Sequence, residues 1–357
     1  MKKIDLRSDT VTVFTENMKK SMLTCELGDD VFNSDPTVQK LEELAAKIVG
    51  KEASVFVPTG TMANQLAILS HANGQKGKEI ICGQWSHIAW DENASTSLLS
   101  GGQLRTLPQN ENGEMDLNKI QKAIRTPHPV YPETAIVCLE NTFHGQALSL
   151  DYIQKVRELT QKHNLPLHLD GARLFNAAWA VGGDVQKITK YFDSLQFCLS
   201  KGLCCPVGSI LAGSKDFCDK AKKYRKMLGG TMRQTGILAG PGIVALTEQI
   251  EQIQKDHQMA KNLYQQFKEK FSEYLNIKEY KENSTNMIFF QFKNEQYNIE
   301  KQNVFIDFME TKNIIVTNAW EPDYMFRFVI HYYIREQQIE AIVQSMQDFL
   351  TTIYQKN

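Results

Sequence analysis

Residues 197–209 read Phe-Cys-Leu-Ser-Lys-Gly-Leu-Cys-Cys-Pro-Val-Gly-Ser and contain one lysine, Lys201, at a Ser-Lys-Gly turn between two apolar segments. The first segment predicts a buried strand, and the second begins at Ile210. A lysine at the end of a buried strand can be desolvated until its amine is partly neutral. Such an amine can attack a carbonyl carbon. The alternative for so short a motif is a surface lysine in a tight turn.

Upstream of Lys201, residues 165–173 read Leu-Pro-Leu-His-Leu-Asp-Gly-Ala-Arg. Here too an apolar strand is predicted to end in a charged side chain, Asp170. Pyridoxal phosphate (PLP) needs a lysine for its Schiff base and a carboxylate at its ring nitrogen. A helix N-cap is the alternative role for Asp170. Because the two charges follow two predicted strands in this order, we interpret them as the two sides of one PLP pocket.

The composition is that of a globular protein and gives no reason to expect nucleic acid or a membrane as partner. Of the 357 residues, 42% are hydrophobic, and 40 basic against 41 acidic side chains give a net charge of −1. Seven cysteines without a Cys-x-x-Cys spacing favour free thiols in a reducing compartment, so we expect a cytoplasmic protein. No metal ligands are predicted. The length suggests two domains, which we place at residues 1–245 and 246–357.

Predicted strands and helices alternate through the first domain. Strands are expected at 53–57, 79–82, 104–107, 135–139, 165–170 and 197–199, with helices between them. This alternation predicts a mostly parallel sheet covered by helices. Sites in such sheets gather at the carboxyl ends of the strands. The polar side chains predicted at these ends are Thr61, His87, Asn141, His144, Asp170 and Lys201.

Two of these strand ends suggest further contacts with a cofactor. Residues 58–65 form a turn of small residues between a strand and a helix, where free N–H groups of Gly60 and Thr61 can bind a phosphate. Helix capping by a threonine explains the same residues. His87, at the next junction, is a candidate to stack on a planar cofactor or to act as an acid or base. A purely structural histidine is the alternative.

Three further segments of the chain supply candidates for binding anions. Ser8 lies in a short polar N-terminal arm, where a hydroxyl close to an arginine suits a carboxylate. Arg233 follows a glycine turn and is either solvated or bound to a phosphate. After a long helical pattern over 237–271, residues 286–353 predict a smaller α+β domain. Arg327 interrupts an apolar strand there, and its charge is costly unless it meets an anion.

Taken in order, these segments resemble the low-specificity L-threonine aldolases, PLP enzymes of the aspartate aminotransferase fold type within the β-eliminating-lyase group. The resemblance covers nearly the whole chain. It rests on residues 5–12, 28–31, 58–65, 139–142, 169–173, 200–203, 228–234 and 327–329. It implies an α/β protein of PLP-dependent fold type I, with a mostly parallel seven-stranded sheet in the large domain and a small C-terminal α+β domain.

The resemblance also implies a role for each candidate residue. Lys201 would form the Schiff base with PLP, Asp170 would bind the ring nitrogen, and His87 would stack on the ring. The phosphate would be bound by Gly60, Thr61 and Arg233, and the substrate carboxylate by Ser8, Arg173 and Arg327. The segment Glu-Asn-Thr-Phe-His-Gly at 140–145 is shorter than the usual family loop, and its histidine, His144, is shifted by one position.

The activity that the resemblance implies is cleavage of L-threonine or L-allo-threonine to glycine and acetaldehyde. The base for the β-hydroxyl proton is left open between His87, His144 and a water molecule. Family members are homotetramers built from dimers, with sites at the subunit boundary. The alternatives are β-elimination or transamination on the same fold, or a scaffold that has kept the pocket without catalysis.

Overall fold

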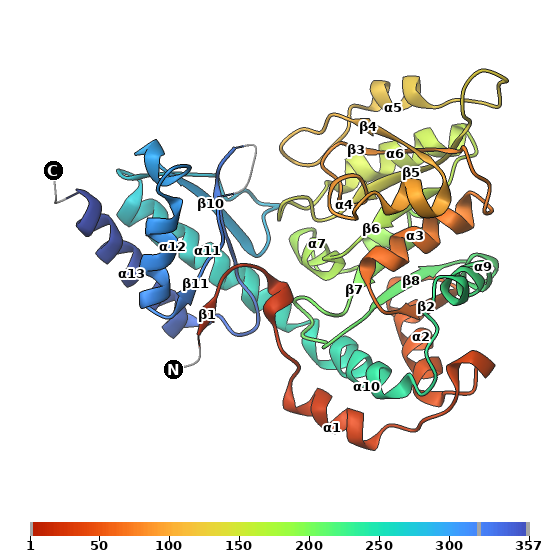
Figure 1. The fold of residues 1–357 in the computed structure, drawn as a ribbon, viewed down its shortest axis with the longest axis horizontal. Coiled ribbons are helices and arrows are strands. Elements are labelled where there is room, and N and C mark those ends of the chain that lie inside the picture. Colours follow the sequence, from red (N-terminus) through yellow and green to blue (C-terminus); the bar gives the residue numbers. More distant parts are fainter. Residues whose placement is uncertain (1–2, 320–322, 355–357) are drawn as a thin grey trace. The chain divides into compact units, whose positions relative to one another are not determined.

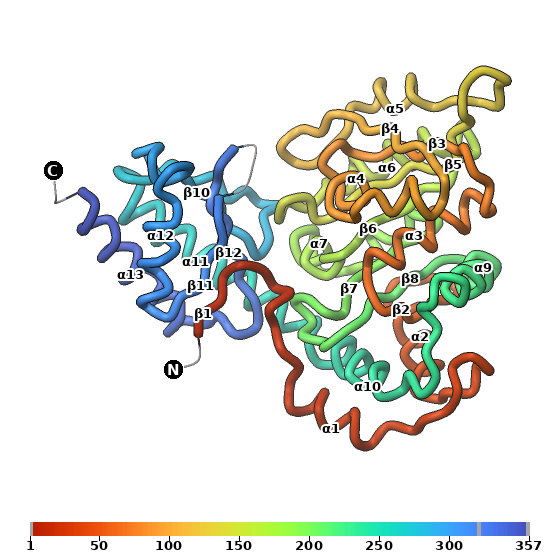
Figure 2. Tube along the Cα trace, in the orientation of Figure 1, coloured from red at the N-terminus to blue at the C-terminus, as the bar shows by residue number. Residues whose placement is uncertain are grey.

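The computed structural model describes residues 3–319 and 323–354, which divide into two units (Figures 1 and 2). The large unit is Val13–Ile250, and the small unit combines Met1–Thr12 with Glu251–Asn357. Each is described by itself below. The sequence placed the division at 245/246 and assigned the N-terminal arm to the large domain, whereas the structure divides the chain at 250/251 and groups the arm with the small unit.

A seven-stranded sheet forms the centre of the large unit, in the order β2-β8-β7-β6-β5-β3-β4. All neighbours pair in parallel except β8, which is antiparallel to both β2 and β7. Most of these strands are short buried runs, as expected where helices cover both faces of a sheet. Their bounds are β2 Ala53–Val57, β3 Glu79–Gly83, β4 Gln103–Leu107, β5 Thr134–Glu140, β6 Leu167–Asp170, β7 Ser194–Cys198 and β8 Ser209–Gly213.

The register between β6 and β7 aligns the polar residues of these two strands. His168 lies opposite Ser194, and Asp170 lies opposite Gln196. Because successive side chains of a strand alternate between faces, the two pairs point to the same face of the sheet. Asp170 is the last residue of β6, and Lys201 follows the end of β7 by three residues. The carboxyl ends of adjacent strands therefore supply both charged groups.

Helices surround this sheet, and side-chain caps start several of them. Asp35 accepts hydrogen bonds from the N–H groups of Thr37 and Val38, with Pro36 at the first helical position. Thr59 caps α3 in the same way. The helices of the large unit are α1 Glu16–Thr24, α2 Pro36–Val49, α3 Gly60–His71, α4 His87–Trp90, α5 Leu117–Ala123, α6 Leu150–Lys162, α7 Leu174–Ala180, α8 Gln186–Thr189, α9 Lys215–Met227 and α10 Gly236–Val244, with 3-10 or π turns at Asp30–Phe32, Thr96–Ser100 and Ala245–Gln249.

The small unit has an antiparallel sheet in the order β12-β10-β9. Its core is rich in phenylalanine, and Phe290, Phe305 and Phe326 are fully buried. Its other elements pack around this core. The bounds are β9 Leu275–Ile277, β10 Met287–Phe292, β12 Phe326–Val329, α11 Gln252–Phe271, α12 Gln302–Thr311 and α13 Glu336–Tyr354, with 3-10 turns at Asp9–Val11 and Glu295–Tyr297.

The N-terminal arm belongs to the small unit because its backbone pairs there. β1 (Ile4–Asp5) runs parallel to β11 (Ile314–Ile315), and the two lie side by side in Figure 1. The carbonyl of Leu6 accepts a hydrogen bond of 3.0 Å from the N–H of Val329, and the Leu6 side chain is fully buried in the phenylalanine-rich core.

Among the helices of the described residues, none combines the length and the apolar composition that a membrane span requires.

Candidate active site

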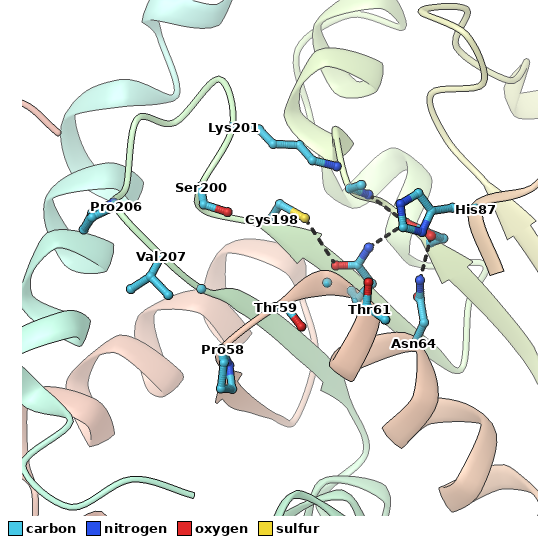
Figure 3. A pocket seen from close by; sticks show the side chains of 15 residues that line it. Pro58, Thr59, Thr61, Asn64, His87, Cys198, Ser200, Lys201, Pro206 and Val207 are labelled. Atoms are coloured by element: carbon cyan, nitrogen blue, oxygen red, sulfur yellow. Dashed lines mark hydrogen bonds between the residues drawn. The ribbon is translucent and has the colours of Figure 1, made fainter. Parts of the chain in front are cut away.

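A cavity of about 340 Å³ lies at the carboxyl ends of β6 and β7 in the large unit. Lys201 extends into it from the turn after β7, and His87 also lies at its wall (Figure 3). Its volume is within the range of small-molecule sites. The lining residues are Pro58, Thr59, Gly60, Thr61, Asn64, His87, Asp170, Ala172, Gln196, Cys198, Ser200, Lys201, Pro206, Val207 and Gly208. The structure thus brings the predicted lysine and aspartate into one cavity.

Three donors fix the orientation of the Asp170 carboxylate, which is 4% exposed. Gln196 Nε2 donates to Oδ1 at 2.5 Å, and the N–H of Ala172 donates to the same oxygen at 3.1 Å. Asn64 Nδ2 donates to Oδ2 at 2.7 Å. These partners come from β7, the turn after β6 and α3, so the main elements around the cavity jointly position this carboxylate.

His87 is held by a buried carboxylate. Its Nδ1 lies 2.9 Å from Glu92 Oε1, and the Glu92 side chain is fully buried. This hydrogen bond, with a further contribution from the charge of Asp170, raises the pKa of His87 to about 9 despite partial burial. The imidazole is therefore protonated at neutral pH, and it presents a positive charge to the cavity.

Glu140, the last residue of β5, is a second, partly buried acid next to His87. Its Oε2 accepts a hydrogen bond of 2.7 Å from the N–H of His87. Burial, followed by repulsion from Asp170, raises the pKa of Glu140 to about 8. At neutral pH this side chain is therefore mainly protonated. The site thus combines Lys201 with a histidine cation and a neutral glutamic acid.

The start of α3 is built to accept an anion. The side chain and the carbonyl of Thr59 accept the N–H groups of Met62 and Ala63, respectively, while Gly60 and Thr61, the first two helical residues, line the cavity. A Cβ atom at Gly60 would lie 2.9 Å from the sulfur of Cys198, so only glycine fits there without a shift. A phosphate at this helix start and a ring between Lys201 and Asp170 would both fit the residues present.

Three predicted residues of the large unit do not line this cavity. Arg173 lies in the turn after β6, one residue beyond the lining Ala172. His144 lies in the loop after β5, with its ring centroid 4.3 Å from that of Phe143. Arg233, predicted at the phosphate, instead donates to Asp29 at 3.0 Å, and its side chain is 59% exposed. The phosphate contact of Arg233 stays a prediction, and within the large unit its side chain makes this surface ion pair.

Ser8 and Arg327 belong to the small unit. The Ser8 hydroxyl accepts the N–H of Thr10 at 3.2 Å and so starts a 3-10 turn. Arg327, on β12, donates to the carbonyl of Arg7 at 3.1 Å. The arm and β12 therefore bring the two predicted carboxylate ligands into one region of this unit.

Sequence reasoning missed the residues that support the charged groups. Asn64, Glu92, Glu140 and Gln196 were not assigned roles, although each makes a hydrogen bond to Asp170 or His87 or to their carboxylate partners. One signal was available for Gln196, because a polar residue in the apolar run of β7 is costly unless it is paired. Glu92 lies only five residues from its partner His87, but no recognised motif in that segment marked the pairing.

The fold and the pocket define an α/β enzyme with a lysine and an aspartate at adjacent strand ends, a class that suits PLP. The chain belongs to the beta-eliminating lyase family, whose model matches residues 5–294. It is 47% identical over 268 residues to low-specificity L-threonine aldolase 1 of Arabidopsis thaliana, which covers 74% of this chain and 75% of that protein. It is 37% identical over 347 residues to the low specificity L-threonine aldolase of Escherichia coli K12, covering 97% and 99%.

Solved structures confirm the predicted fold class. A putative L-allo-threonine aldolase from Listeria monocytogenes superimposes with a TM-score of 0.77 at 21% identity, covering 93% of this chain and 92% of the other. The threonine aldolase of Leishmania major gives a TM-score of 0.78 at 18% identity, with coverages of 97% and 99%. The predicted family and the α/β architecture with a mostly parallel seven-stranded sheet are therefore confirmed.

Proposed function

We propose that this protein is a PLP-dependent carbon–carbon lyase that cleaves L-threonine or L-allo-threonine to glycine and acetaldehyde. The observation that carries the proposal is the cavity that contains both Lys201 and the firmly held Asp170. The similarity to low-specificity L-threonine aldolases over up to 97% of the chain supports the substrate class. In the reaction the Cα–Cβ bond breaks, the β-hydroxyl loses its proton, and Cα gains one.

The residues of the cavity fit the parts of PLP. Lys201 would hold its aldehyde carbon through the amine, Asp170 would accept a hydrogen bond from its ring nitrogen, and Gly60 with Thr61 would donate to its phosphate. When bound, PLP supplies a ring that takes up the electron pair of the broken bond. His87 would lie against this ring. Because His87 is protonated at neutral pH, it would place a positive charge beside the ring and would not act as a base.

We assign the β-hydroxyl proton to His144, from the loop after β5. This loop follows the carboxyl end of a strand that neighbours β6, so it arises at the same sheet edge as Asp170. His87 is protonated at neutral pH and therefore cannot accept this proton. Arg173, in the turn after β6, is assigned to the substrate carboxylate, whereas Ser8 and Arg327 of the small unit stay predictions from the family resemblance. If His144 is the base, His144→Asn lowers kcat by about 10²-fold or more and leaves PLP affinity unchanged.

We also propose a homotetramer of paired dimers in the cytoplasm. Large apolar side chains are exposed on the large unit, among them Leu23, Phe32 and Leu98, which are 83%, 78% and 80% exposed. Association would bury them, and Arg233 could then reach a site of a neighbouring subunit. The free thiols of all seven cysteines suit a reducing compartment. Size-exclusion chromatography with light scattering should give about four times the 40.7 kDa chain mass.

The activity is tested by acetaldehyde release from L-threonine and L-allo-threonine, coupled to a dehydrogenase that consumes NADH. The purified protein should show the visible absorption band of lysine-bound PLP, and Lys201→Ala should abolish both band and activity. A visible band together with release of 2-oxobutanoate and ammonia from threonine, or with amino-group transfer, but without acetaldehyde, would support β-elimination or transamination. A colourless protein would support a scaffold without catalysis.

A further inference from the structure

A chain of buried hydrogen bonds continues from the cavity into the sheet. Its middle members are the facing pair His168 and Ser194 on β6 and β7, where His168 Nδ1 lies 2.8 Å from the Ser194 hydroxyl. Both side chains are at most 1% exposed. They lie two residues before Asp170 and Gln196 on the same face of the sheet, so the chain lies directly beneath the carboxylate of the cavity.

Helix α3 supplies both ends of this chain. Asn64 and His71 are seven residues, or two turns, apart, so they lie on one face of the helix. His71 Nε2 is 2.7 Å from the Ser194 hydroxyl. At the other end, Asn64 Oδ1 is 3.3 Å from His168 Nε2, while Asn64 Nδ2 lies 2.7 Å from Asp170 Oδ2 and 2.8 Å from Glu92 Oε1.

The donors and acceptors fit only one direction along this chain. Carboxylate oxygens accept, so both amide hydrogens of Asn64 are donated to Asp170 and Glu92. The oxygen of Asn64 must then accept from His168 Nε2. Burial lowers the pKa of His168 to about 3, so the ring is neutral and its Nδ1 accepts the hydroxyl proton of Ser194. Ser194 can in turn accept from His71 Nε2.

We propose that His168 is a positioning residue for the reaction, which acts by holding Asn64 in the one orientation that serves both carboxylates of the cofactor site. This inference rests on the proposed function, because it assigns Asp170 to the ring nitrogen of PLP. If His168 Nε2 no longer donates to Asn64 Oδ1, the side-chain amide of Asn64 is free to rotate. It can then present its oxygen, instead of its NH₂ group, to a carboxylate. Hydrogen bonds that all point one way also strengthen one another, so Ser194 supports the same contact.

The test is the dissociation constant for PLP, measured by absorbance after the full-length protein has been stripped of cofactor. We expect His168→Leu to weaken PLP binding about 10-fold and Ser194→Ala about 3-fold. His168→Gln keeps an N–H donor and should stay within about 3-fold of the wild type. The pH at which the visible band changes should shift in the first two variants and not in the third.

A control variant removes a partly buried histidine elsewhere. His257, on α11 of the small unit, is also neutral because burial lowers its pKa to about 4. His257→Leu should lower the melting temperature without changing PLP affinity. Equal PLP affinity and an unshifted band in His168→Leu and Ser194→Ala overturn the positioning role alone. Should His168→Leu not fold, Ser194→Ala and His168→Gln decide. A wild-type protein that binds no PLP overturns both this inference and the proposed function.

Discussion

Gly60 is the residue at which a single carbon decides the shape of the cofactor cavity. It begins α3 and faces the sulfur of Cys198, which leaves 2.9 Å for any added Cβ. Overpacking of this kind costs about 1–3 kcal/mol. At Gly60 such a shift would move the start of α3, which is assigned to the phosphate. A side chain larger than glycine at position 60 should therefore weaken cofactor binding.

We predict that Gly60→Ala weakens PLP binding about 10-fold, equivalent to about 1.4 kcal/mol. The measurement is an absorbance titration with PLP. Cys198→Ala removes the obstructing sulfur, so the double variant Gly60→Ala with Cys198→Ala should recover most of the affinity. Additive losses in the double variant would contradict the steric explanation.

A second prediction concerns the charge on His87. Its pKa of about 9 in the folded protein lies above the ordinary 6.5, so this pair stabilises the folded protein fully below pH 6.5 and loses its contribution as the pH rises through 9. Glu92→Gln removes the main cause of the raised pKa. We expect the difference in melting temperature between wild type and Glu92→Gln to shrink between pH 6.5 and 9.5. A difference that does not change over this range would contradict the assignment.

The two charges that define the pocket, Lys201 and Asp170, could be predicted from sequence because each ends an apolar run. Their supports could not. Asn64, for example, contacts Asp170, which is 106 residues away in sequence, only once α3 has packed against the sheet. The ion pair of Arg233 with Asp29 could not be predicted either, since Asp29 lies far from it in sequence. Local patterns therefore predicted the reacting groups, whereas tertiary packing determined the hydrogen bonds that orient them.

Among the helices, Arg335 fastens the start of α13 to α11. It donates to Asp256 Oδ1 at 2.9 Å and to the carbonyl of Ile334 at 2.8 Å. Asp256 is 1% exposed, and burial raises its pKa to about 7 although Arg335 opposes this. The Arg335–Asp256 pair thus connects the two helices. Removing Arg335 would leave a buried carboxylate without its cation, which destabilises the folded protein.

We predict that Arg335→Ala lowers the free energy of unfolding by about 3 kcal/mol. The loss should be greater at pH 8.5 than at pH 6, because the unpaired Asp256 must ionise in the folded protein at the higher pH. Urea unfolding at both values measures this. Adding Asp256→Asn should remove the pH dependence, and a loss that is equal at both pH values would count against the ion pair.

Element bounds in the large unit follow local sequence closely, and the strand predicted at 53–57 is β2 as observed. The long helical pattern over 237–271 is instead divided into α10, a π-helical segment and α11. Periodicity alone does not reveal this division, because the apolar spacing continues through it. Nor does it reveal β1, two residues long, whose pairing with β11 assigns the arm to the small unit.

Across the protein, buried groups with opposite proton preferences set the pH of greatest stability. Burial lowers the pKa of His71, His168 and His257 to about 4, 3 and 4. The unfolded chain binds these protons below pH 6.5 and the folded protein does not, so stability falls as the pH falls from 6.5. Glu140, Asp256 and His87 have raised pKa values of about 8, 7 and 9, so they hold protons in the folded protein that the unfolded chain releases.

These opposing groups predict a stability maximum near pH 6.5 for the cofactor-free protein. Above this pH the buried histidines are neutral in both states and contribute no slope, while Glu140, Asp256 and His87 all lose protons on unfolding. Glu140 alone should lower the free energy of unfolding by about 2 kcal/mol between pH 6.5 and 9, at about 1.4 kcal/mol for each pH unit up to its pKa. Urea titrations followed by circular dichroism at half-unit steps from pH 5 to 9 give the profile. A free energy of unfolding that keeps rising beyond pH 7.5 would mean that Glu140 and His87 do not hold their protons in the folded protein, and would contradict their raised pKa values.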